Sequence, residues 1–364
     1  MPTGQSPSQA PSRELESPSP RPSPARPAGR RRVSMDDVAQ HAGVSAQTVS
    51  RVSNGYPGVV ESTRRLVLDA MRELGYRPNS AARALKRGEF RTIGVIMSTL
   101  ATTGNMRTLE AITRAALEQG YAVTLLPPAP AQQEDGGFSR VGEDVVDGVI
   151  VVMERHQLDE SLLVLPPGMP AVVADTDLAH VYPVVDTDQD AGARSAVAHL
   201  LELGHRTVWH VAGPEESFSA GRRANAWRAL LQEKGIEAPP MVVGDWTAAS
   251  GYQAGLRLAD EPSCTAVFAA NDQMALGILR ALHEKGRRVP QDVSVVGFDD
   301  NPDSSSYLPP LTTVHQDFSE VGRRCIEIVL ALLRSRPPDD AATTVELVPT
   351  HLVVRQSTAN FRGP

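Results

Sequence analysis

Short runs of β-branched residues alternate with helical stretches through most of the chain after residue 91. This alternation predicts an α/β core of parallel sheets with helices on both faces, and the run is long enough for two such sheets. Strands are expected at Thr92–Met97, Ala122–Leu126, Gly148–Met153, Ala171–Asp175, Pro183–Val185, Thr207–Ala212, Met241–Val243, Ala266–Ala270, Val293–Phe298 and Thr312–His315. Helices are expected at Met106–Gln119, Ala191–Leu203, Gly221–Lys234, Ser250–Leu258 and Gln273–Lys285.

Ahead of the sheets, two short amphipathic segments meet at Ala42-Gly43-Val44. Ser34 has Asp37 three residues later, which predicts a capping box at the start of a first helix. Ser45 is expected to cap a second helix. Two short helices that cross over a small core are typical of a helix-turn-helix domain.

A third helix is expected to start at Glu61 or Ser62 and to end at Gly75, with Pro78 preventing its continuation. The side chains expected to face the core are Leu66, Val67, Ala70, Met71 and Leu74. Residues 33–78 are therefore predicted to form an all-α domain.

Charge is distributed unevenly along the chain. The net charge is -7, but residues 30–91 carry 12 Arg and Lys against 6 Asp and Glu, whereas residues 92–364 carry 21 against 35. A basic head on an acidic body indicates that nucleic acid binds at one end only. On the exposed face of the second helix, Gln47 could read adenine, and Arg51 could read guanine or contact phosphate.

Two flanking segments are expected to lack a stable fold of their own. Residues 1–32 form a tail whose first 29 positions hold 8 Pro and 6 Ser, and such a segment buries too little apolar surface to stay ordered. Residues 79–91 begin with Asn79 as a helix cap and contain Leu85 among alanines and arginines. This segment is too short to be a stable helix alone. A plain linker is one interpretation; a hinge that folds against DNA is the one the spacing favours.

The head resembles the LacI/GalR family of bacterial transcriptional repressors. The matching patterns are D-V-A-x-x-A-G-V-S-x-x-T-V-S-R-V-x-N, then R-x-x-V-x-x-A-M-x-E-L-G-Y-x-P-N, and then I-G-V. The resemblance implies a dimer that places the second helix of each head in a major groove, with Leu85 wedged into the minor groove. The DNA-binding residues it implies are Ser34, Ser45, Ala46, Gln47, Thr48, Ser50, Arg51, Asn54, Asn79, Ala82 and Leu85. A family member has an aromatic residue where this chain has Ala46, so the same operator sequence is not expected.

Polar side chains follow several of the predicted strands, and ligands of doubly wound sheets bind beyond the carboxyl ends of the strands. Asp299 follows one strand and Asn271 another, Trp246 lies just after a third, and Arg223 lies in a helix that follows a fourth. Carboxylate, amide and guanidinium groups pair with vicinal hydroxyls, and an indole offers a flat face to a sugar ring. The set suits a neutral, hydroxyl-rich ligand.

The family resemblance extends to this part of the chain through G-D-W-T-A-A-S-G-Y-Q, A-N-D-Q-M-A-L-G and V-V-G-F-D-D-N-P-D-S-S-S-Y-L-P-P-L-T-T-V-H-Q-D-F. It implies that residues 92–360 form a core like that of periplasmic sugar-binding proteins, with two doubly wound subdomains joined by three crossovers. The effector pocket it implies contains Leu100, Arg223, Trp246, Asn271, Asp299, Gln316 and Phe318. A β-galactoside is the expected effector, and no cofactor is expected. Residues 127–147 match poorly and give no prediction for the wall of the first subdomain.

Other functions have less support in the sequence. It contains no G-x-S-x-G, G-x-x-x-x-G-K-[ST] or G-x-G-x-x-G pattern, and its nine histidines show no metal-ligand spacing, so neither an enzyme nor a metal site is expected. A sugar-binding protein of transport type would carry an apolar signal segment, which is not seen. Action of the ligand as a corepressor rather than an inducer stays open.

Location and assembly follow from similar observations. With two cysteines and no long apolar run, a cytoplasmic protein without a membrane span is expected, and it would act at the nucleoid. The C-terminus has no leucine heptads of the kind that make a tetramer in this family, which predicts a homodimer.

Overall fold

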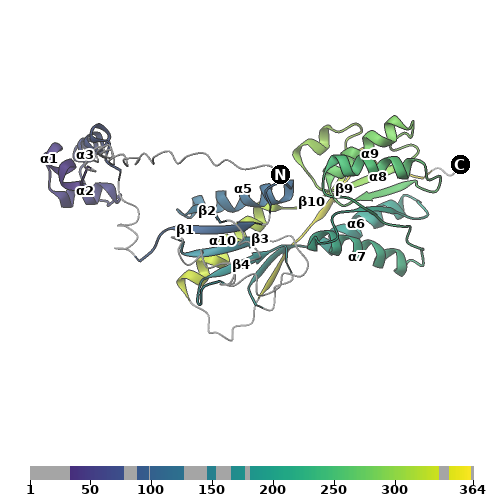
Figure 1. Cartoon of the computed structure of the whole chain (residues 1–364), viewed down its shortest axis with the longest axis horizontal. Helices are drawn as coiled ribbons and strands as arrows, with labels where there is room; N and C mark the ends of the chain where they lie inside the picture. The colour runs from purple at the N-terminus through teal and green to yellow at the C-terminus, as the bar shows by residue number, and fades with distance from the viewer. Residues whose placement is uncertain are drawn as a thin grey trace, which may run out of the picture. The chain divides into compact units, whose positions relative to one another are not determined.

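The computed structural model describes residues 33–77, 88–97, 99–126, 146–152, 165–176, 181–335 and 344–361. The chain divides into a head unit, residues 1–80, and a core unit, residues 81–364 (Figure 1). The predicted tail at 1–32 lies outside the described residues, and so does most of the predicted hinge, including Asn79, Ala82 and Leu85. No helix in the described ranges is long and apolar enough to cross a membrane.

The described part of the head unit, residues 33–77, forms three helices: α1 (Met35–His41), α2 (Ala46–Ser53) and α3 (Glu61–Leu74). The capping box at Ser34 is confirmed, because Asp37 N donates to Ser34 Oγ and Ser34 N donates to Asp37 Oδ2. Ser45 caps α2 as predicted. Gly75 ends α3 in the left-handed conformation, with φ 65°, that favours glycine. The core of the head unit is made by Val38, Ala39, Ala42, Val49, Val52, Val67, Ala70 and Met71.

The prediction that Leu66 faces this core is wrong, because 51% of its surface is exposed. The inward stripe of α3 follows Val67, Ala70, Met71 and Leu74, which are spaced by three and four residues. Leu66 lies one position before the first of these and is therefore rotated by about 100° away from the stripe.

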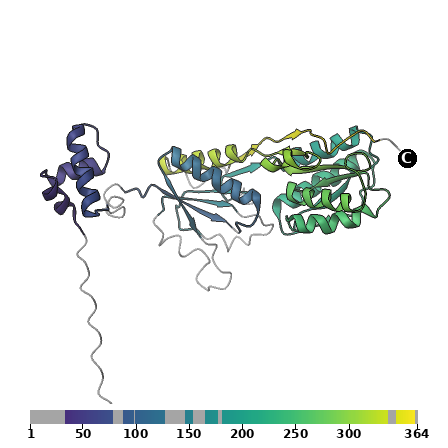
Figure 2. The same cartoon turned by 90° about the horizontal axis from the view of Figure 1, so that it is seen from above.

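The core unit contains two six-stranded sheets. The first sheet has the order β11-β5-β4-β3-β1-β2, and all of its pairings are parallel. Its strands are β1 (Thr92–Met97), β2 (Ala122–Leu126), β3 (Gly148–Val152), β4 (Ala171–Ala174), β5 (Val184–Thr187) and β11 (Val345–Val348). Helices α5 (Thr103–Glu118) and α10 (Phe318–Arg334) pack side by side on one face of it (Figure 2). We call this sheet and its helices the first lobe.

The second sheet has the order β12-β10-β9-β8-β6-β7 and is parallel except for β12, which pairs antiparallel with β10. Its strands are β6 (Trp209–Ala212), β7 (Val242–Val243), β8 (Ala266–Ala269), β9 (Ser294–Asp299), β10 (Thr312–His315) and β12 (His351–Val353). Its helices are α6 (Gln189–Glu202), α7 (Phe218–Glu233), α8 (Ala248–Ala259), α9 (Asp272–Glu284) and the 3-10 helix η2 (Pro302–Ser306). α6 and α7 cover one face and α8 and α9 the other, so this second lobe is doubly wound.

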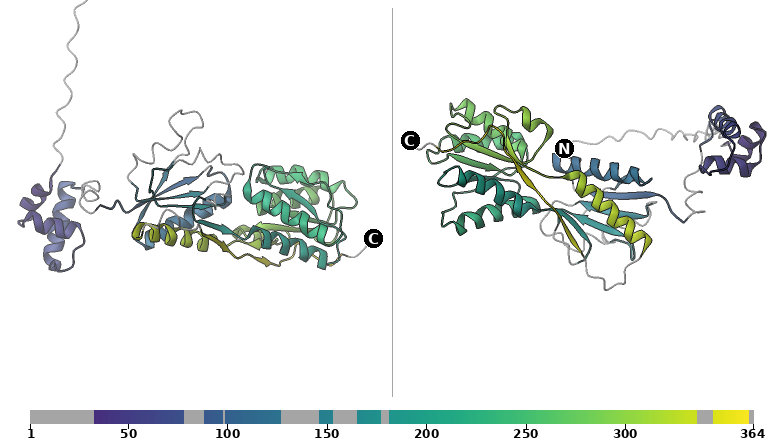
Figure 3. Two further views of the ribbon diagram at one scale, coloured as in Figure 1. Left: turned by 90° about the horizontal axis from the view of Figure 1, so that it is seen from below. Right: turned by 180° about the vertical axis from the view of Figure 1, so that it is seen from behind.

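The chain passes between the lobes three times, from β5 to α6, from β10 to α10 and from β11 to β12 (Figure 3). The crossing segments contact one another: Thr350 Oγ1 donates to the carbonyl of Asp188, and Gln189 Nε2 donates to Gln316 Oε1 at 3.4 Å. The predicted architecture of two parallel-sheet subdomains with three crossovers is thus confirmed. The strands β11 and β12 and the helix α10 were not among the predicted elements.

Val67 faces the core of the head unit and Leu66 is exposed, so a substitution at each position gives a matched test of the orientation of α3. Val67→Ala should destabilise the head unit by about 1–2 kcal/mol, because Val67 is fully buried. Leu66→Ala should cost less than about 0.5 kcal/mol although it removes more atoms. Amide hydrogen exchange of peptides from α1 to α3 would measure both. Equal acceleration in the two variants would contradict the orientation of α3.

Candidate functional site

Helix α2 presents the side chains that could read base edges. Gln47 and Arg51 are exposed and lie one turn apart, while Val49 and Val52 point into the core. Arg64, Arg65 and Arg72 of α3 each have a carboxylate partner, but Arg51 has no ion-pair partner among the described residues. The guanidinium of Arg51 is therefore available to an external acceptor.

Hydroxyl groups among the predicted DNA-binding residues also hold the helix ends together. Ser34 Oγ donates to Asp37 Oδ2 at 2.8 Å. Ser45 Oγ accepts from Thr48 N and lies 2.9 Å from Thr48 Oγ1. At the other end of α2, Asn54 Nδ2 donates to the carbonyl of Ser50 at 2.7 Å, and Ala46 is half-buried at the first position. Both ends of α2 are therefore fixed, which holds Gln47 and Arg51 on one rigid surface.

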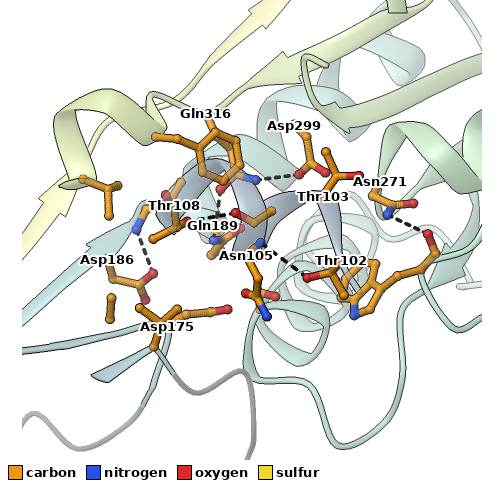
Figure 4. A pocket seen from close by; sticks show the side chains of 18 of the residues that line it. Thr102, Thr103, Asn105, Thr108, Asp175, Asp186, Gln189, Asn271, Asp299 and Gln316 are labelled. Atoms are coloured by element: carbon orange, nitrogen blue, oxygen red, sulfur yellow. Dashed lines mark hydrogen bonds between the residues drawn. The ribbon is translucent and has the colours of Figure 1, made fainter. Parts of the chain in front are cut away.

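A cavity of about 70 Å³ lies between the two lobes of the core unit. Both lobes line it, at the carboxyl ends of their strands and at helix N-termini (Figure 4). Of the predicted pocket residues, those that line the cavity are Arg223, Trp246, Asn271, Asp299, Gln316 and Phe318. Typical ligand pockets measure about 300–1,000 Å³, so the lining side chains must rearrange to admit a sugar-sized ligand.

Leu100 is the predicted pocket residue that the structure does not bring to the cavity. It lies in the loop between β1 and α5, and 42% of its surface is exposed. The part of this segment that turns toward the cavity comes later, where α5 begins, and there Thr102 and Thr103 line the cavity. This segment therefore contributes two polar side chains to the cavity, where the prediction had placed the apolar side chain of Leu100.

A buried guanidinium organises the second-lobe side of the cavity. Arg223 is 4% exposed; its Nε donates to Gln189 Oε1 at 2.8 Å, and its Nη1 donates to the carbonyl of Ala270. The same Nη1 lies 3.6 Å from Asp299 Oδ1, which also accepts from Gln316 Nε2 at 2.6 Å. These groups form one continuous hydrogen-bonded chain along the cavity wall, positioned to exchange partners with a ligand.

Three residues at the cavity have left-handed backbone conformations that side chains other than glycine rarely adopt. They are Asp175 with φ 55°, Trp246 with φ 71° and Asp299 with φ 108°. Asn271 supports Trp246 by donating from Nδ2 to its carbonyl at 3.0 Å. Such conformations cost about 1–3 kcal/mol each and persist where the surroundings enforce them, and they concentrate at binding sites.

The first-lobe wall contains two carboxylates that sequence reasoning missed, Asp175 after β4 and Asp186 in β5. Asp186 is buried, and it accepts from Arg222 Nη1 of the second lobe at 3.1 Å and from Thr187 N at 2.7 Å. Asp175 Oδ1 is buried and has no hydrogen-bond partner in the described part of the chain. One signal was present: Asp175 ends the predicted strand Ala171–Asp175, as Asp299 follows another.

Burial dominates the electrostatics of these carboxyl groups. It raises the pKa of Asp175 to about 6, while Arg223 and Arg222 lower it. Burial, followed by the charge of Asp175, raises the pKa of Asp186 to about 7. The pKa of Asp299 is also raised by burial, against the lowering effects of Arg223, Gln316 and Arg107. A ligand that donates hydrogen bonds to these oxygens would offset part of this desolvation.

The polar lining also includes Thr108 and Asn105 on α5, Ser219 on α7 and Gln189 at the start of α6. No cluster of three or more His, Cys, Asp or Glu side chains suited to a metal ion occurs among the residues that the structure describes. The two cysteines, Cys264 and Cys325, are free and buried. The arrangement thus offers hydrogen-bond donors, acceptors and two aromatic faces to a ligand.

A helix-turn-helix head joined to a two-lobed α/β core with an interlobe cavity defines a class of ligand-responsive DNA-binding regulators. Residues 34–79 match the model for bacterial regulatory proteins of the lacI family, and residues 197–358 match the periplasmic binding protein-like domain. The chain is 36% identical over 334 residues to the lactose operon repressor of Escherichia coli (strain K12), covering 90% of this chain and 91% of that one. It is 33% identical over 341 residues to the transcriptional regulator CelR of Thermobifida fusca, covering 90% and 99%.

Solved structures are similar over the same extent. The lac repressor dimer bound to operator and the anti-inducer ONPF has a TM-score of 0.79 at 35% identity, covering 90% of this chain and all of that one. The CelR–cellobiose complex has a TM-score of 0.66 at 31% identity, with the same coverage. The chain belongs to the lacI family of DNA-binding transcriptional regulators, as its motifs predicted.

The buried carboxyl group of Asp175 gives a prediction about pH. Its pKa is about 6 in the folded chain and about 4 in the unfolded chain, so the folded state binds more protons between these values and loses stability as pH rises through them. Asparagine also tolerates a left-handed backbone. Asp175→Asn should therefore stabilise the core unit at pH 8, on the order of 1–3 kcal/mol, and much less at pH 4.

Urea unfolding of the full chain, followed by tryptophan fluorescence, would measure this, because Trp209, Trp227 and Trp246 all lie in the core unit. Asp190→Asn, an exposed site on α6, serves as the control. A stabilisation by Asp175→Asn that does not change with pH would contradict the role given to burial.

Proposed function

We propose that this protein is a homodimeric repressor that binds a pseudo-palindromic operator and is released from it by a small neutral sugar. The observation that carries the proposal is the interlobe cavity, where both lobes supply hydrogen-bonding groups on the same chain as a DNA-reading head. A ligand that bridges two lobes binds their arrangements unequally, which is the requirement for shifting an equilibrium. The sugar is bound and released unchanged, without catalysis.

In the DNA complex, Gln47 and Arg51 read base edges, while Ser34, Ser45 and Thr48 contact phosphates. Ser34 caps α1 and Ser45 caps α2, so phosphate contacts at these two helix starts would set the register of the reading helix α2 on the DNA. Residues 79–91 act as the hinge, and Leu85 inserts into the minor groove between the two heads. A regulator of chromosomal genes acts on the nucleoid in the cytoplasm, where we place this chain.

The chemistry of the cavity supports a neutral, hydroxyl-rich effector. Asp175, Asp186 and Asp299 face the cavity, and they would repel a phosphorylated or carboxylated sugar more than Arg223 alone would attract it. Vicinal hydroxyls can pair with Asp299, Asn271 and Arg223, and Trp246 and Phe318 offer faces to the ring. A β-galactoside is the effector we favour, because the similar repressors include that of the lactose operon.

An exposed groove on the second lobe supports the dimer. β7, α8 and α9 line it, and Val243 and Leu276 leave more than two fifths of their surface exposed there. Apolar side chains gathered on one face are typical of an interface, and a twofold axis would set this face against the same face of a second copy. The similar lac repressor was solved as a dimer on its operator.

The decisive experiment selects DNA from a random-sequence library with the full chain and then adds single sugars to the selected complex. Methyl β-D-galactoside, cellobiose, glucose and glucose 6-phosphate make a suitable panel. The proposal expects a pseudo-palindromic DNA and release by a neutral sugar. Tighter DNA binding on addition of a sugar would show a corepressor instead, and failure to select any DNA would overturn the proposal.

The reading role of Gln47 predicts a change in specificity. Gln47→Ala should weaken binding to the selected operator by about 1–3 kcal/mol per half-site and relax the base preference at one position of it. Repeating the selection with this variant measures both effects. If all sequences lose affinity equally, Gln47 contacts the DNA backbone and the assignment fails.

The effector role of Arg223 predicts a separation of the two activities. Arg223→Lys should keep operator affinity within about threefold, because the head is a separate unit, and should weaken sugar-induced release by about tenfold or more, because lysine cannot reach both Gln189 and Asp299. Titration of the operator complex with the releasing sugar measures this. Release at unchanged sugar concentrations would remove Arg223 from the effector site.

A further inference from the structure

One side chain of α5 reaches from the first lobe to the second lobe beside the cavity. Arg107 Nη1 donates to the carbonyl of Asp299 at 3.0 Å, and it lies 3.4 Å from the carbonyl of Asp300 and 3.4 Å from Asn301 Oδ1. Arg107 belongs to the first lobe, and its three acceptors lie in the turn after β9 of the second lobe. It is outside the cavity lining, so it would not touch an effector itself.

The turn that Arg107 binds is strained. Asp299 and Asp300 have φ values of 108° and 50°, so two consecutive residues other than glycine occupy the left-handed half of the backbone map. The carbonyls of this turn point toward the first lobe, while the carboxylate of Asp299 lines the cavity. The conformation that presents the carboxylate is therefore the same one that offers two carbonyls to Arg107.

Arg107 also contacts an aromatic wall of the cavity. Its guanidinium carbon lies 4.3 Å from the centroid of the Phe318 ring, at the start of α10. A guanidinium over a ring face is attracted by the ring quadrupole and holds the ring plane. A single cation thus orients two groups that face the cavity: Phe318, which lies in its own lobe, and Asp299, which lies in the other lobe and which it can hold only while the lobes are close together.

We propose that Arg107 is a positioning residue that couples lobe closure to effector recognition, by holding the strained turn at Asp299 and the ring of Phe318 in their binding orientations. The proposal deepens the function proposed above and rests on it for the effector. When the lobes separate, the carbonyls of Asp299 and Asp300 lose this donor and the turn can relax. An effector that binds Asp299 then favours closure through Arg107, and closure favours the effector equally.

The electrostatics of Asp299 agree with this role. Burial raises its pKa, and Arg107 is one of the groups that lower it, after Arg223 and Gln316. The other charged groups that face Asp299 are Arg223, Asp175 and Asp272, each on a different element. Arg107→Gln removes only the charge of Arg107 and leaves these three groups in place. A change in the pH dependence of effector binding in this variant is therefore caused by the loss of Arg107.

Two variants and one control separate positioning from general stability. Arg107→Gln removes the charge, and Arg107→Lys keeps it but cannot contact three acceptors and the ring at once. Arg114→Gln is the control, because Arg114 lies on the same helix, is exposed and pairs only with the neighbouring Glu110 among the described residues. Folding of each variant is checked by tryptophan fluorescence of the core unit.

The first readout needs no effector. Spin labels at the exposed positions Glu118 on the first lobe and Glu237 on the second report the distance between the lobes in the full chain. Arg107→Gln should shift the distance distribution toward open arrangements, whereas Arg114→Gln should match the parent chain. Identical distributions in all three proteins would overturn the proposal, whether or not a sugar effector exists.

The second readout uses methyl β-D-galactoside as the probe. Arg107→Gln should weaken its binding about tenfold or more, and binding should be lost at a higher pH on acidification, because Asp299 accepts a proton more readily without Arg107. Arg107→Lys should restore the pH profile but only part of the affinity. An unchanged pH profile in Arg107→Gln would overturn the positioning role. If the parent chain binds no sugar of the panel, the effector proposal fails while the distance measurement still decides on Arg107.

Discussion

The two lobes of the core unit are held close by polar contacts that each need a group from both sides. Arg222 of α7 pairs with the buried carboxylate of Asp186, and Gln273 of α9 donates to Thr103 Oγ1 of α5. Charges and amides taken out of water must find partners inside the protein, and here those partners belong to the opposite lobe. Separation of the lobes returns these groups to water at little net cost, which is why such an interface can open and close.

That constraint explains why the cavity is polar although each lobe has an ordinary apolar core. The sheets are filled by residues such as Val151 and Phe268, which have no exposed surface, and this packing fixes each lobe as a rigid body. Polar groups collect where strands end, because backbone and side chains there have no sheet neighbour to pair with. Parallel strands bring all their carboxyl ends to one edge, so the collection becomes a binding site.

Much of the fold, and part of the cavity lining, could be predicted from the sequence. Runs of β-branched residues predicted β1, β2 and β10 with their observed bounds. The alternation of buried strands with helices leaves little freedom in where each strand begins and ends. On the second-lobe side, Asn271, Asp299 and Arg223 could be predicted because they follow strands, whereas Gln316 came from the family resemblance and Ser219 was not predicted. Asp186 of the first lobe was not predicted, although it directly follows the expected strand Pro183–Val185, because the sequence does not show the partner Arg222 that pairs with it in the buried end of β5. The prediction for Leu66 was wrong for a related reason, because the hydrophobicity of one residue does not determine which side of a helix faces the core.

Regulation requires that ligand binding in the cavity affect the head unit. Residues 78–87 are the covalent connection between the described parts of the two units. A connection that was stable by itself would transmit nothing, because its conformation would not depend on the core. The hinge proposed for residues 79–91 would be at the opposite limit, because so short a segment needs outside support to form a stable helix. In the proposed dimer, a small change in the separation of the two hinges would then decide whether they are helical. In the function proposed here, the strained turn at Asp299 would respond to the ligand, and the hinge would respond to the lobes that the ligand moves.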